Sequence, residues 1–129
     1  MTAPALALWG TYPNFSRDEF NCRHTGRNEM RHDFMLVLQA IRTEFGRPMR
    51  VTSGYRHPTH PVEARKGHSS GEHTRGTCAD IACTSGDERF ALVQLALKHG
   101  FHRIGIANTF LHLGLGGPGL PAQVIWEYS

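Results

Sequence analysis

Apolar residues recur at helical spacing in two segments of the chain. In residues 29–45 they come every three or four positions: Met30, Phe34, Leu38, Ile41 and Phe45. This spacing puts them on one face of a helix, and Gly46 with Pro48 beyond it is typical of a helix end. Residues 87–99 show a second amphipathic pattern that ends at Gly100, with Ser85 or Gly86 as its N-cap. The pattern therefore predicts two helices.

Shorter segments alternate between apolar and polar positions or form brief apolar runs, which is typical of strands. They cover residues 49–53, 77–83, 103–107, 110–115 and 123–128. Ser16 and Glu19 have the spacing of a capping box and predict a helical turn through Phe20. Residues 58–67 are expected to form a loop with one helical turn at 62–65. The sequence thus predicts an α+β fold, with helices packed on a small, mainly antiparallel sheet, in one continuous domain of residues 1–129.

Composition narrows the range of partners. The chain has 129 residues, a net charge of +3, and 14 basic residues that are spread along it rather than clustered. This spread argues against nucleic acid as a partner, while a mildly basic surface favours anionic partners such as cell-wall polymers. The apolar stretches are too short to span a membrane, and a monomer is expected. The N-terminus lacks the features of a signal peptide, so we expect synthesis in the cytoplasm and another export route for action on the cell wall.

The three cysteines do not suggest a disulfide framework. Cys22, Cys78 and Cys83 are odd in number and form no CxxC pair, which makes a zinc ribbon improbable. Cys78 and Cys83 flank an apolar run, so we expect both to be buried free thiols.

Two polar residues interrupt apolar strands. Asp80 lies within residues 78–82 and His112 within residues 110–114. His73 lies seven positions before Asp80, with Gly76 between them to permit a turn. Imidazole and carboxylate groups are zinc ligands, and one ligand in a loop with others on strands is geometrically reasonable. A buried carboxylate needs a partner, so Asp80 could instead pair with an arginine, and His112 could be a hydrogen-bonded core residue.

The segment GEHTRGTCADI, residues 71–81, resembles the SxHxxGxAxD signature of the M15 metallopeptidases, which include zinc D-Ala-D-Ala carboxypeptidases. His73, Gly76 and Asp80 match the signature, whereas Gly71 replaces its serine and Cys78 its first alanine. Other segments resemble further blocks of the family and follow one another in the family's order, from about residue 14 to residue 128. Along the chain they are NFSRDEFNC, TSGYRHPTHPVEA, FLH and VIWEY. The resemblance implies a fold of the hedgehog/DD-peptidase type. The lead-in resembles that of compact members found in phage lysis enzymes and tail proteins.

The resemblance also implies a mechanism. One Zn²⁺ per chain would be held by His73, Asp80 and His112, where it would polarise a scissile carbonyl and lower the pKa of a bound water. Arg56 matches the family's arginine that holds the substrate carbonyl or the developing oxyanion; alternatively it forms a structural salt bridge, to Glu63 or Asp80. The implied substrates are peptidoglycan stem peptides, cut beside D-amino acids by a carboxypeptidase or an endopeptidase. Tyr55 and His57 are expected substrate contacts.

The general base is the weak point of the match. Family members carry an acid three residues before the last histidine ligand or two residues after it, and these positions are Thr109 and Gly114 here. The remaining candidates are Glu72, Glu127 and the histidines His57, His60 and His102. Each glutamate could otherwise be an exposed charge. We prefer Glu127, because a terminal strand can run beside the metal strand. The alternative to an enzyme is a zinc-binding module without catalytic activity, for wall recognition or virion structure.

Overall fold

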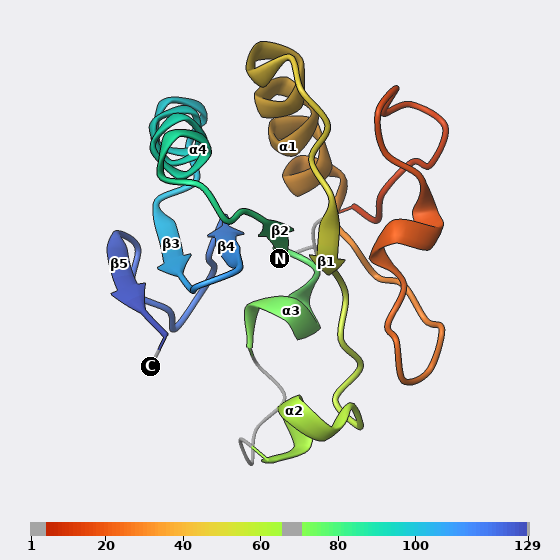
Figure 1. Ribbon diagram of the computed structural model, residues 1–129. Coiled ribbons are helices and arrows are strands. Elements are labelled where there is room, and N and C mark those ends of the chain that lie inside the picture. Colours follow the sequence, from red (N-terminus) through yellow and green to blue (C-terminus); the bar gives the residue numbers. More distant parts are fainter. Residues whose placement is uncertain (1–4, 66–70, 129) are drawn as a thin grey trace.

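The computed structural model describes residues 5–65 and 71–128 and contains a five-stranded sheet with helices on both sides (Figure 1). The strand order is β1-β2-β4-β3-β5. The strands are β1 (Val51–Ser53), β2 (Cys78–Ala82), β3 (Arg103–Ile106), β4 (Phe110–Gly114) and β5 (Val124–Glu127). The helices are η1 (Arg17–Phe20), α1 (His32–Phe45), α2 (Pro61–Arg65), α3 (Glu72–Arg75) and α4 (Gly86–His99). The predicted α+β class is confirmed; the sheet is antiparallel except where β5 pairs parallel to β3.

Helix α1 begins later than its apolar pattern suggested. Met30 is buried but precedes the helix, because its carbonyl accepts a hydrogen bond from the backbone N–H of Ala7 at 2.8 Å. The N–H of Arg31 donates to the carbonyl of Gly76 at 3.0 Å. Because the backbone groups of Met30 and Arg31 form hydrogen bonds with other segments, the helix begins at His32. The capping box at Ser16 and the Ser85 cap of α4 are both present as predicted.

The sheet separates a hydrophobic core from a polar face. Side chains that alternate along the central strands fill the core side and are fully buried: Ala79, Ile81, Ile104, Leu111 and Leu113. They belong to one cluster with α1 and α4, where Phe34 stacks on Phe101 at 4.9 Å between ring centroids. Figure 1 shows α1 and α4 together on one side of the strands, and α3 and α2 on the other. The remaining strand positions therefore face α3.

One local prediction needs correction. His73 was expected in a loop, but it lies in α3, a single helical turn too short to show any apolar period. The helical turn predicted at 62–65 is confirmed by α2, which also includes Pro61, and the last two positions of the predicted loop, Lys66 and Gly67, lie outside the described residues. In the parts of the chain that the structure describes, no helix has the length and apolarity that crossing a membrane requires.

Candidate metal centre

Strand pairing brings the polar residues of three segments onto one face of the sheet. Asp80 on β2 pairs with His112 on β4, and His112 pairs on its other side with Gly105 of β3. Gly105 in turn lies opposite Trp126 of β5. Directly paired residues project to the same side of a sheet, so Asp80, His112 and Trp126 share the face that α3 covers.

His73 reaches this face from α3. Its Nδ1 lies 2.8 Å from the carbonyl oxygen of Gly54, which can only accept, so Nδ1 carries the proton. Its Nε2 lies 3.4 Å from Oδ2 of Asp80. The imidazole is buried, and because Nδ1 is bonded to a backbone carbonyl, Nε2 is the ring nitrogen that could bind a metal.

Asp80 lies between two imidazoles. Its Oδ1 is 3.2 Å from Nδ1 of His112, and the rings of His73 and His112 are 5.2 Å apart. Burial alone would raise the pKa of Asp80, but its close contacts with His112 and His73 lower it far below its usual range. Burial alone would lower the pKa of His112, but Asp80 and Glu72 on either side raise it. Asp80 is therefore a carboxylate at neutral pH.

A thiol lies in the same cluster. Ligand atoms of His73, Cys78 and His112 all lie within 4.8 Å of one another, and burial raises the pKa of the Cys78 thiol well above its usual value. This group shares both histidines with the predicted set but has Cys78 in place of Asp80. We favour Asp80 as the third ligand, because it is already ionised and contacts both imidazoles. The sequence predicted Cys78 only as a buried thiol, and its place two residues before Asp80 on β2 was the available signal.

These donors fit zinc. Zinc is held in proteins by imidazole nitrogen, carboxylate oxygen and thiolate sulfur, usually with four ligands in a tetrahedral arrangement. A His73 ring oriented by a backbone carbonyl is the support that such ligands receive. The chemistry of the donor set thus agrees with the predicted metal.

Glu72 is buried, so it is not the exposed charge that the sequence left open as an alternative. Its Oε1 lies 2.7 Å from Nε2 of His112 and 2.9 Å from Nε of Arg103, and its Oε2 accepts the backbone N–H of Gly116 at 2.9 Å. Burial alone would raise the pKa of Glu72, but His112 and Arg103 lower it overall. This carboxylate is therefore ionised, buried and held on both oxygens.

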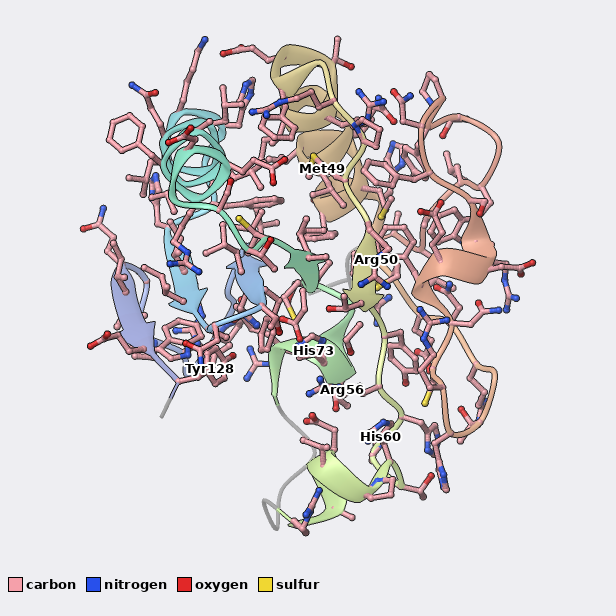
Figure 2. The ribbon with its side chains drawn as sticks, viewed as in Figure 1. Met49, Arg50, Arg56, His60, His73 and Tyr128 are labelled. Carbon is pink, nitrogen blue, oxygen red and sulfur yellow. The ribbon has the colours of Figure 1, made fainter. Side chains whose placement is uncertain are left out.

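Arg56 forms both of the salt bridges that the sequence left open. Its Nη1 lies 3.2 Å from Oε2 of the fully buried Glu63, and its Nη2 lies 3.5 Å from Oδ2 of Asp80. Its Nε donates to Oγ of Ser53 at 3.0 Å. Figure 2 shows Arg56 close to His73, on the side of the sheet where α3 lies. The guanidinium is therefore fixed beside the candidate metal ligands.

A cavity of about 520 Å³ opens over these groups. Its described lining includes Arg56 on one side and Phe110, Trp126 and Tyr128 on another. A side chain at position 105 would collide with the rings of Trp126 and Tyr128, so Gly105 lets these aromatic rings lie over β3. Trp126 then reaches His112, at 5.1 Å between ring centroids. The cavity has a polar floor and an aromatic wall.

Three predicted residues are not among those described as lining this cavity. The Tyr55 hydroxyl is turned towards Glu29, to which it donates at 3.1 Å, and His57 contacts Thr59 and Arg27. Glu127 is exposed and alternates with Trp126 along β5, which places it on the opposite face of the sheet. Of the predicted site, the structure brings together His73, Asp80, His112 and Arg56.

The fold and the site define a candidate metal centre, with imidazole and carboxylate donors at the floor of an open cavity. The chain matches the family model described as Peptidase M15 over residues 13–114 and belongs to that family. A comparison with curated proteins found no match. Membership of a peptidase family and a metal-compatible cluster at the matching positions support each other.

Proposed function

We propose that this protein is a zinc-dependent peptidase that cleaves peptidoglycan stem peptides beside D-amino acids. The observation that carries the proposal is the convergence of His73, Asp80 and His112 beneath a cavity with Arg56 at its edge. Zinc bound there would supply a Lewis acid that activates water and polarises the scissile carbonyl. Membership of the M15 peptidases supports the same chemistry.

The residues of the chain supply binding and orientation. Arg56 is positively charged at any working pH and donates in a planar fork, so it would hold a carbonyl oxygen and stabilise negative charge that develops on it. Glu63 and Ser53 fix the guanidinium in place, which reduces the reorganisation that binding requires. Trp126 and Tyr128 offer flat apolar surfaces to the aliphatic parts of a stem peptide.

The net charge of +3 supports a polyanionic wall as the surrounding medium. A phage lysis enzyme or a virion component would meet this substrate. The proposal leaves both a carboxypeptidase and an endopeptidase as forms of the same reaction, distinguished by the fragment released.

A second function is favoured by one observation. The carboxylates among the described cavity-lining residues are Glu72 and Asp80, and both are already bound to imidazoles. Position 109 holds threonine and position 114 glycine, so neither supplies an acid. A zinc-binding module without turnover would have such a site.

Mass spectrometry of fragments released from purified peptidoglycan separates the two functions. The peptidase should release a stem-peptide fragment that disappears with a chelator, returns with zinc, and is absent with Asp80→Ala. Glu127→Gln is the matched comparison, because this acid lies on the far face of the sheet; unchanged release would exclude it as the base. Zinc bound at one ion per chain with no fragment from any wall type would favour the binding module.

A further inference from the structure

Glu72 directly contacts His112, one of the candidate metal ligands. Its carboxylate is buried against Nε2 of His112, while Nδ1 of the same ring faces Asp80 at 3.2 Å. An imidazole can bind a metal through one nitrogen and donate from the other. Both carboxylates can only accept, but Glu72 is the closer one, at 2.7 Å from Nε2 against 3.2 Å for Asp80 at Nδ1, so it favours the tautomer with the proton on Nε2 and the lone pair on Nδ1.

Two hydrogen bonds and an ion pair converge on Glu72 and fix its position. Oε1 contacts His112 and forms an ion pair with Nε of Arg103, and Oε2 accepts the N–H of Gly116. The side chain of Arg103 is held in turn, because its Nη1 donates to the carbonyl of Pro121 at 2.7 Å. Because the carboxylate of Glu72 is held in place, it can in turn hold the imidazole ring of His112 in one orientation.

Gly114 makes room for this carboxylate. A Cβ at position 114 would lie 2.1 Å from Oε2 and 2.7 Å from Cδ of Glu72. Gly114 lies two residues after His112 on β4, on the same face of the sheet. The carboxyl group of Glu72 therefore occupies the space into which a side chain at position 114 would project.

From these contacts we propose that Glu72 is the positioning carboxylate of the metal centre, entering from α3 in place of a side chain at position 114. It holds Nε2 of His112 so that Nδ1 is the atom offered to the metal. Glu72 acts through His112 and is not itself a ligand. The inference rests on the metal site of the proposed function, but not on turnover.

Zinc affinity, measured by competition with a chelating dye, tests this role. Glu72→Gln keeps the shape but replaces one acceptor by a donor, and it should weaken zinc binding about 10–100-fold. Glu63→Gln is the matched control: Glu63 is also buried and bonded to an arginine, but it contacts neither imidazole, so zinc affinity should change far less. Circular dichroism and thermal unfolding establish that each variant is folded.

A relocation variant makes the test sharper. Gly114→Asp alone puts a second carboxylate where Glu72 lies and should weaken zinc binding. Combined with Glu72→Ala, the same aspartate should recover much of the affinity that Glu72→Ala alone loses, because a carboxylate again lies beside Nε2 of His112. If Glu72→Ala does not fold, Glu72→Gln and the ring measurement below decide the matter.

Nitrogen-15 chemical shifts of the His112 ring supply a readout that a merely structural residue would not move. In the zinc-loaded wild type, Nε2 should carry the proton and Nδ1 should show the shift of a metal-bound nitrogen. The reverse pattern, or Glu72→Gln that binds zinc as tightly as the wild type, would overturn the inference while leaving the peptidase intact. A wild type that binds no zinc would overturn both the inference and the proposed function.

Discussion

Replacing Gly76 with alanine should strongly destabilise the fold. Gly76 ends α3 with φ of +74°, a left-handed conformation that costs an alanine roughly 1–2 kcal/mol. The new Cβ would also lie 2.0 Å from the carbonyl oxygen of Glu29 and 2.9 Å from Cα of Met30. These are backbone atoms, and Met30 and Arg31 are held by backbone hydrogen bonds to Ala7 and Gly76. Relieving the overlap should add about 1–3 kcal/mol.

Gly46 provides a matched comparison for this prediction. It ends α1 with φ of +72°, but a Cβ there would meet no atom within 4 Å. Gly46→Ala therefore carries the conformational cost alone, about 1–2 kcal/mol, against a total of about 2–5 kcal/mol for Gly76→Ala. The two substitutions differ in the collision and not in the chemistry of the side chain.

Urea unfolding, followed by circular dichroism in the presence of a chelator, measures both losses. The midpoint should fall clearly further for Gly76→Ala than for Gly46→Ala, with similar slopes for both variants. Equal destabilisation would refute the reasoning, because it would mean that the Glu29–Met30 backbone moves aside at no cost. The chelator removes any contribution of bound metal to the comparison.

Four further substitutions probe the site and its surroundings. Asp80→Ala should weaken zinc binding by more than about 100-fold, as expected for a lost ligand, whereas Cys78→Ala should weaken it much less. Competition with a chelating dye measures both affinities. The opposite order of the two losses would mean that the Cys78 thiol is the ligand. Tyr55 has its pKa raised to about 12 by burial and by its bond to Glu29. Its contribution to stability is thus complete below the unfolded value of about 10 and is lost as the pH rises through about 12. Urea midpoints of the wild type and Tyr55→Phe should converge over that range, and a constant difference would contradict the assignment. Gly105→Ala should displace the ring of Trp126 and cost about 1–3 kcal/mol, seen as a changed fluorescence spectrum and a lower urea midpoint; an unchanged spectrum would contradict the close approach.

The sequence located the candidate ligands on strands better than the parts around them. Asp80 and His112 stood out because a polar residue in an apolar strand needs a partner. That the two lie directly opposite each other on antiparallel strands is known only from the structure. The setting of His73 was harder to foresee, because a helix of four residues carries no periodic signal. Arg56 was placed by resemblance, and both of its open salt-bridge alternatives are present together.

Gly114 was a signal in the sequence that could have pointed to the proposed role of Glu72. Gly114 ends an otherwise apolar strand, and a glycine within a strand often marks the close approach of another group. Which group approaches could not be derived, since Glu72 lies about 40 residues earlier in the chain. The preference for Glu127 considered strand order alone. Period-two alternation from Trp126 would have placed Glu127 on the opposite face.

The strand order determines how a long ligand can lie in this cavity. Arg56 follows β1, at one edge of the sheet, and Tyr128 follows β5, at the other (Figure 2). A peptide that extends from Arg56 to Tyr128 must therefore cross the strands rather than run beside one of them. It cannot join the sheet as an additional strand, so its backbone is not read by a ladder of hydrogen bonds. Recognition of such a peptide would then depend on its carbonyl groups, side chains and termini, and the alternating geometry of an L-peptide strand would not be required of it.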